Sequence, residues 1–141
     1  MPDQPAPKTL NLQLWFGDVL VADLLNVFPH QGTWFAEYRQ VVTPEAGPVQ
    51  ARLCEFIRFC EEWHDRLACG QNPDAAEFDR FKDVIESPSW RVPCPDGTEL
   101  TMPEGPIFVQ GEASWNHPEA ESSRELAAAQ VWTRLTSGSG K

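Results

Sequence analysis

The sequence predicts an α+β fold: an antiparallel sheet of about five strands, with two central helices and a C-terminal helix packed on it. Three observations lead to this prediction. Segments with strand-like alternation come first, segments with helical periodicity fill the middle, and strand-like segments return before a last helical stretch. This order of elements is typical of α+β domains built on antiparallel sheets.

An N-terminal three-stranded meander is expected over residues 9–16, 19–28 and 33–42. In the first segment, apolar residues alternate with mostly polar ones, which is the period of two of a half-buried strand. Gly17-Asp18 marks a turn after this strand, and residues 29–32 mark another between the second and third strands. Short turns of this kind join antiparallel neighbours.

Two helices are expected in the middle of the chain. Residues 48–69 carry apolar side chains at helical spacing, with Pro48 suited to the first turn and Gly70 to the C-terminal stop. Asp74 and Glu77 have the spacing of a capping box, which predicts a second helix that ends near residue 86.

Strands return after residue 89 and are expected to form a C-terminal hairpin. Residues 107–115 are expected to form the last strand, in which Gly111 permits a bulge. A C-terminal helix follows over about residues 123–135. We expect a single domain over residues 9–135, with a disordered Pro-rich tail at residues 1–8 and a disordered Gly/Ser tail at residues 136–141.

The chain is acidic, with 21 Asp and Glu against 11 Lys and Arg among 141 residues, a net charge of −10. Without a basic footprint, binding to nucleic acid or to an anionic membrane is disfavoured. No apolar run is long enough to span a bilayer, and the N-terminus lacks the pattern of a secretory signal. A cytoplasmic protein with four free thiols is therefore expected.

One candidate binding site consists of His30 and Trp34 near the second turn, with Trp115 and His117 at the end of the last strand. If the two strand ends meet, these residues could line a pocket at the sheet edge in which a histidine transfers protons. The alternative is that the tryptophans pack over the sheet while the histidines lie in solvent.

Cys60 and His64 are weak candidates for a metal site, since residues four apart share a helical face. A zinc site needs two further ligands, and the alternative is that both residues pack in the apolar stripe. We expect no metal and no cofactor. Motifs of phosphate-binding loops and of serine nucleophiles are absent, so enzyme activity is uncertain and disfavoured.

Two functions remain open from the sequence. The first is a cytoplasmic protein-binding domain, in a specialised form an inhibitor or immunity-type protein that neutralises a basic partner. Its acidic surface could be the face of the central helices, although interleaved arginines also fit an ordinary solvated surface. The second is a small-molecule-binding protein or enzyme with a pocket near Trp34 and Trp115. The chain is expected to be a monomer or a homodimer.

Overall fold

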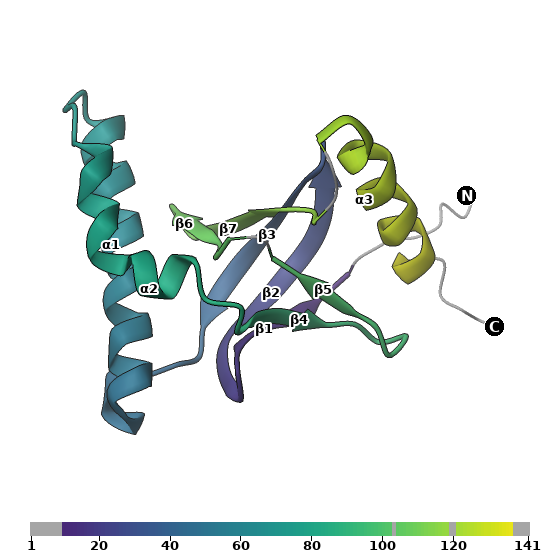
Figure 1. The fold of residues 1–141 in the computed structure, drawn as a ribbon, viewed down its shortest axis with the longest axis horizontal. Helices are drawn as coiled ribbons and strands as arrows, with labels where there is room; N and C mark the ends of the chain where they lie inside the picture. The colour runs from purple at the N-terminus through teal and green to yellow at the C-terminus, as the bar shows by residue number, and fades with distance from the viewer. Residues whose placement is uncertain (1–9, 103, 119–120, 137–141) are drawn as a thin grey trace, which may run out of the picture.

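The computed structural model describes residues 10–102, 104–118 and 121–136. Within this part of the chain, seven antiparallel strands and three α-helices are present, so the predicted α+β class is confirmed. The sheet curls into a half-barrel (Figure 1). Of the tails predicted at residues 1–8 and 136–141, Thr136 alone lies within the described residues.

The strands lie across the sheet in the order β5-β4-β1-β2-β3-β7-β6. Their bounds are β1 Leu12–Phe16, β2 Val19–His30, β3 Thr33–Gln40, β4 Trp90–Pro93, β5 Glu99–Thr101, β6 Ile107–Val109 and β7 Glu112–Asn116. The predicted meander, β1–β2–β3, forms the centre of the sheet. Two hairpins, β4–β5 and β6–β7, extend it at opposite edges.

The prediction of about five strands is wrong because the second half of the chain forms two hairpins. Residues 107–115 form most of the β6–β7 hairpin instead of one bulged strand. Gln110 and Gly111 form its turn with φ of 51° and 81°. Positive φ at both turn positions matches the twist of a two-residue hairpin, and it reverses the chain where a bulge would only bend it.

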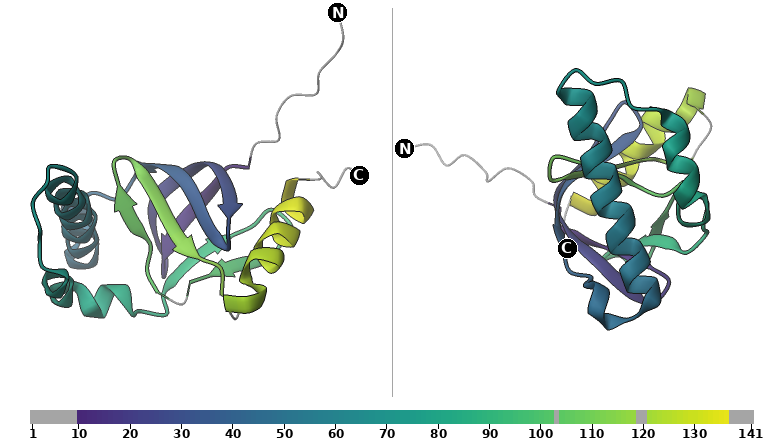
Figure 2. Two further views of the ribbon diagram at one scale, coloured as in Figure 1. Left: turned by 90° about the horizontal axis from the view of Figure 1, so that it is seen from above. Right: turned by 90° about the vertical axis from the view of Figure 1, so that its left-hand side faces the viewer.

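The helices lie at two ends of the curled sheet (Figure 2). At one end are the 3₁₀ turn η1 (Pro44–Ala46), the long helix α1 (Pro48–Ala68), the 3₁₀ segment η2 (Ala75–Phe81) and the short helix α2 (Lys82–Ile85). At the other end is α3 (Glu121–Thr136), which is anchored by Trp132 Nε1 donating to the Val27 carbonyl oxygen at 3.0 Å.

The second central helix differs from its prediction, since most of it winds as a 3₁₀ segment. Asp74 caps this segment by accepting the Ala76 N–H at 2.9 Å. Glu77 does not complete the predicted capping box, because its carboxylate pairs with Arg66 of α1 instead. This ion pair links η2 to the C-terminal half of α1.

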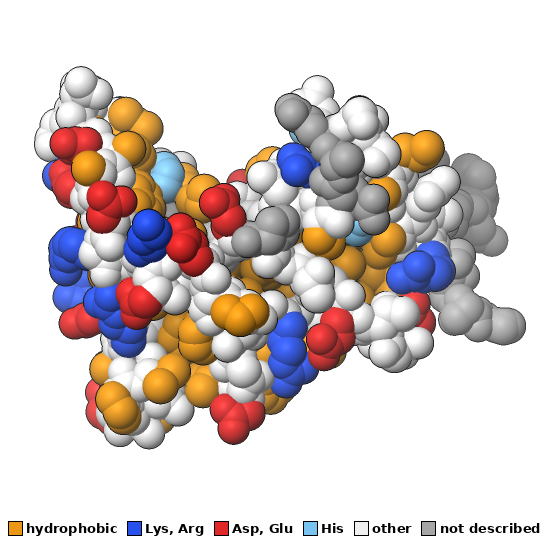
Figure 3. Space-filling model, in the orientation of Figure 1, with side chains coloured by type: hydrophobic (Ala, Val, Ile, Leu, Met, Phe, Trp, Pro, Cys, Tyr) orange, Lys and Arg blue, Asp and Glu red, His pale blue; other side chains and the backbone are white. Residues whose placement is uncertain are grey.

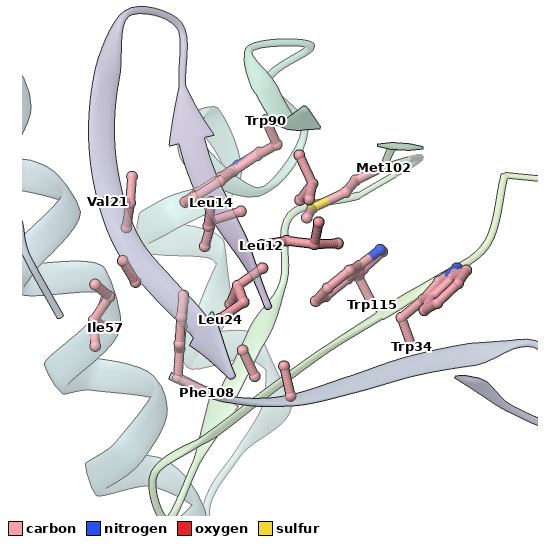
Figure 4. Packing of buried hydrophobic residues seen from close by; sticks show 14 of the residues in the cluster. Leu12, Leu14, Val21, Leu24, Trp34, Ile57, Trp90, Met102, Phe108 and Trp115 are labelled. Atoms are coloured by element: carbon pink, nitrogen blue, oxygen red, sulfur yellow. The ribbon is translucent and has the colours of Figure 1, made fainter. Parts of the chain in front are cut away.

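The hydrophobic core fills the inside of the half-barrel (Figure 4). Strand residues such as Leu14, Leu24 and Trp34 have no exposed surface, and Phe56 of α1 closes the core at one end with 1% exposed. Trp90 is buried beside them, with its indole N–H bonded to the Val84 carbonyl oxygen at 2.8 Å. The face of the sheet that carries these residues is called the inner face below.

Candidate functional site

The two strand ends that carry the predicted binding residues lie side by side. β3 pairs with β7 from Thr33 opposite Asn116 to Glu37 opposite Glu112. Beyond the paired strands, the His117 N–H donates to the Gly32 carbonyl oxygen at 2.9 Å. The Thr33 hydroxyl bonds to the side-chain oxygen of Asn116 at 2.9 Å. The turn after β2 and the end of β7 therefore form one continuous edge of the molecule.

Three of the four predicted residues come together inside the half-barrel. Trp34 and Trp115 are cross-strand partners whose rings stack with centroids 6.4 Å apart. Trp34 Nε1 donates to His117 Nδ1 at 3.1 Å, and His117 is itself buried. His30 is exposed at the end of β2. That these residues bind a ligand stays a prediction; their side chains occupy the inner face or, for His30, the surface.

The indole N–H of Trp115 is buried and has no hydrogen-bond partner among the described residues. An unpaired buried donor costs about 1–3 kcal/mol relative to a paired one. The two stacked tryptophans therefore contribute differently to the stability of the fold, because the N–H of Trp34 donates to His117 and that of Trp115 is unpaired among the described residues.

The predicted metal candidates lie on α1, one turn apart. Cys60 is fully buried, and burial raises the pKa of its thiol to about 12, which disfavours the thiolate that binds metals. His64 Nδ1 lies 2.8 Å from the Cys60 carbonyl oxygen. In the described part of the chain, no three His, Cys, Asp or Glu residues are grouped as metal ligands. All four cysteines are free thiols.

The helical surface carries both signs of charge instead of a uniform acidic face (Figure 3). Arg52 of α1 pairs with Asp83 at 2.9 Å, and Arg66 pairs with Glu77. Lys and Arg side chains therefore offset much of the negative charge on α1, η2 and α2. The helical surface is therefore not a uniformly acidic face that would attract a basic partner.

The outer face of the sheet carries an apolar row that sequence reasoning missed. Trp34 and Ala36 point inward, so Phe35 between them points outward, together with its cross-strand partners Phe28 and Ser114. The row continues to Ile107 of β6, which is the partner of Ser114. The Phe28 and Phe35 rings stack with centroids 5.7 Å apart. Phe28 and Ile107 are each 44% exposed.

A second row on the outer face, two residues further along β3, β7 and β6, places two carboxylates opposite each other. Glu37 of β3 and Glu112 of β7 are direct cross-strand partners, and both are exposed. Leu25 flanks Glu37 on β2, and Val109 flanks Glu112 on β6. No hydrogen bond or ion pair to another described residue offsets either carboxylate. Like charges in this position destabilise a sheet.

A groove of about 410 Å³ opens on the outer face at the apolar row. Ser114 lies between its larger neighbours Phe35 and Ile107, and it leaves space between their side chains. The groove is lined by Thr33, Phe35, Glu104, Gly105, Ile107, Ser114, Trp115, Asn116 and Arg124. One wall is held by the Gly105 N–H, which donates to the Ile85 carbonyl oxygen at 2.7 Å.

Glu61 of α1 fixes the β6–β7 hairpin that carries half of this surface. Its carboxylate accepts hydrogen bonds from the Gly111 N–H at 3.0 Å, from the Gln110 N–H and from the Tyr38 hydroxyl. Burial acts to raise the pKa of Glu61, but these hydrogen bonds and the nearby His64 hold the pKa below its ordinary value. The carboxylate therefore remains charged and fastens the hairpin turn to the helix.

The outer face was missed because β3 has large aromatic residues on both of its faces. Trp34 and Tyr38 alternate with Phe35, so apolar character does not show which face is covered. The sequence does contain one signal for the exposed face: Phe35 and Glu37 lie two residues apart in the same strand. That spacing puts an aromatic and a carboxylate on one face, and a core face would not accept an unpaired carboxylate.

No helix among the described residues is long and apolar enough to cross a bilayer. Comparison with known proteins found no match, whether to a family model, to a curated protein or to a solved structure.

Proposed function

We propose that this chain is a small cytoplasmic protein-binding domain, a monomer or homodimer, that acts by binding a basic partner and not by catalysis. The observation that carries the proposal is the exposed apolar row on the outer face, Phe28, Phe35 and Ile107, beside the opposed carboxylates of Glu37 and Glu112. The net charge of −10 supports a basic partner by long-range attraction. An inhibitor or immunity-type protein is the specialised form of this proposal.

The composition of the face favours binding over a purely structural role. Phe28 and Ile107 are each 44% exposed, so a partner that covers them would gain part of the roughly 1.5–3 kcal/mol that full burial of such a side chain yields. The carboxylates repel each other in the free protein, and a cation from another molecule placed between them would relieve this repulsion. Apolar groups surrounded by charge are typical of protein–protein contact sites, where aromatic side chains contribute much of the affinity.

Selection from a displayed library of random peptides tests this proposal. The wild-type domain is the bait, and the double variant Phe28→Ser/Ile107→Ser is the counter-bait. Leu67→Ser is the matched control, because Leu67 is 47% exposed on α1, away from the sheet. Circular dichroism and unfolding curves verify that all three proteins are folded.

The proposal expects enriched peptides that are rich in Lys or Arg. They should bind the double variant at least about tenfold more weakly, a change of about 1.4 kcal/mol, and bind the control like wild type. Their affinity should fall as salt is raised, since salt screens exposed charges. Equal binding to wild type and to the double variant, or affinities that do not change with salt, would contradict the proposal.

A second candidate function rests on the groove itself, whose volume of about 410 Å³ lies in the range of small-ligand sites. Of the two tryptophans of the predicted pocket at the sheet edge, Trp115 borders this groove and Trp34 does not. Screening of small-molecule fragments by ligand-observed NMR tests this alternative. Fragments that bind the groove of the wild type should not bind Ser114→Leu, because the leucine side chain fills the space between Phe35 and Ile107. Binding unchanged in that variant would remove the alternative.

A further inference from the structure

We propose, building on the proposed function, that the partner docks an extended segment on the outer face. In this segment, a Lys or Arg would lie two residues away from an apolar residue. The apolar side chain would enter the groove between Phe35 and Ile107, and the cation would lie between Glu37 and Glu112.

The spacing of the two rows supports an extended partner. Phe35 and Glu37 are two residues apart on β3, as are Ser114 and Glu112 on β7. Since a strand rises about 3.4 Å per residue, the rows lie about 7 Å apart. Side chains at positions i and i+2 of an extended segment have the same separation and point to the same side. Neighbours on a helix face are closer, about 5–6 Å apart.

The space in the groove between Phe35 and Ile107 is wide enough for one apolar side chain. Phe35 and Ile107 lie on strands that flank β7, so their backbones are about two strand spacings apart, roughly 9.6 Å. Ser114 between them is small, which makes the floor of the groove low. A Leu, Ile, Val or Met side chain placed there would contact both apolar walls. Burying it would remove exposed apolar surface from both molecules.

The cationic seat follows from the register of the strands. Directly opposed residues have Cβ atoms about 4.5–5.5 Å apart, so one ammonium or guanidinium group can reach both Glu37 and Glu112. The neighbouring basic residue on this face, Arg39, is the cross-strand partner of Asp23, whose charge opposes its own. Charge complementarity therefore selects a cation at the Glu37 and Glu112 row.

Two synthetic peptides of identical composition test the inference. One repeats a Lys-Ser-Ile unit, which places the cation and the apolar side chain two residues apart. The other repeats Lys-Ile-Lys-Ile-Ser-Ser, in which no Lys lies two residues from an Ile, so an extended segment carries the two residue types on opposite sides. Fluorescence anisotropy measures their binding to wild type, to Glu37→Gln/Glu112→Gln and to Glu62→Gln/Glu86→Gln. The last variant is the matched control, since it removes the same charge from exposed positions outside the sheet.

The inference expects the first peptide to bind wild type about tenfold more tightly than the second. Its affinity should drop about tenfold, and its salt dependence should flatten, in Glu37→Gln/Glu112→Gln but not in the control. Equal affinities for the two peptides, equal effects of the two double variants, or no binding of either peptide at about 1 mM would overturn it. These outcomes would not decide the proposed function. The library selection tests that separately, through the effect of Phe28→Ser/Ile107→Ser on peptide binding.

Discussion

Replacing Glu61 with Gln should weaken the hydrogen bonds that hold the β6–β7 hairpin to α1, while the side chain keeps nearly the same shape. The carboxylate accepts three hydrogen bonds, from Tyr38, Gln110 and Gly111. The amide of Gln keeps one acceptor oxygen and turns an NH₂ group toward the remaining donors. At least one of the three donors then loses its acceptor.

The expected cost follows from the strength of hydrogen bonds to charged groups, about 1.5–3 kcal/mol each in net terms. Loss of one of them predicts that Glu61→Gln lowers the free energy of unfolding by about 1.5–3 kcal/mol, and loss of two by about 3–6 kcal/mol. This is a large fraction of the 5–15 kcal/mol that is typical of a domain. Glu62→Gln is the matched control, because Glu62 is the next residue on α1 and is exposed.

Urea unfolding at pH 7 and near pH 3 measures both the cost and its origin. The pKa of Glu61 is lowered in the folded protein, so the carboxylate contributes stability above its ordinary pKa of 4.5. That stability is lost as the pH falls through the lowered value. The difference between wild type and Glu61→Gln should therefore shrink at the lower pH.

Two results would refute this reasoning. Equal stabilities of Glu61→Gln and Glu62→Gln at pH 7 would show that the hairpin anchor contributes nothing. A difference that stays constant from pH 7 to pH 3 would show that the charge of the carboxylate is irrelevant. The second result would leave packing as the cause of any destabilisation.

Three further predictions concern other parts of the molecule. Trp34→Phe should destabilise the protein by about 1–3 kcal/mol more than Trp115→Phe in urea unfolding, because it removes a hydrogen bond while the second change removes an unpaired donor. Similar costs for the two variants would contradict the conclusion that the buried Trp115 N–H lacks a hydrogen-bond partner. Glu37→Gln and Glu112→Gln should each stabilise the fold by a few tenths of a kcal/mol, an effect that disappears near 1 M NaCl; a loss of stability at low salt would argue against repulsion. In the native protein, a thiol reagent should label Cys69 rapidly and the other three cysteines slowly, since those three are buried and burial raises their pKa values. Rapid labelling of a second thiol, found by mass spectrometry, would show that the fold opens locally.

Much of the local structure could be predicted because it depends on neighbours in the chain. Pro48 begins α1 and Gly70 follows its end, as the helix signals indicated. The strand turn at Gly17 is present as expected, with a left-handed φ of 61°. Such features need only the conformational preferences of a few adjacent residues.

The parts that could not be predicted depend on contacts between distant segments. Residues 107–115 alternate across Gln110 and Gly111 in a way that fits one bulged strand as well as a hairpin. The choice is made by α1, whose Glu61 accepts hydrogen bonds from the turn about fifty residues later. Which face of β3 is covered is likewise decided by the curl of the whole sheet.

The pairing of β3 with β7 joins residues as much as 83 positions apart, whereas the β1–β2 and β2–β3 pairs of the meander join strands that follow each other in sequence. Closing so long a loop costs entropy before any contact compensates for it, so the meander is expected to form early and the junction with β7 late. The proposed docking face exists only after this junction forms. A chain still in the course of folding would therefore offer its partner no complete surface, and binding would favour molecules that have finished folding.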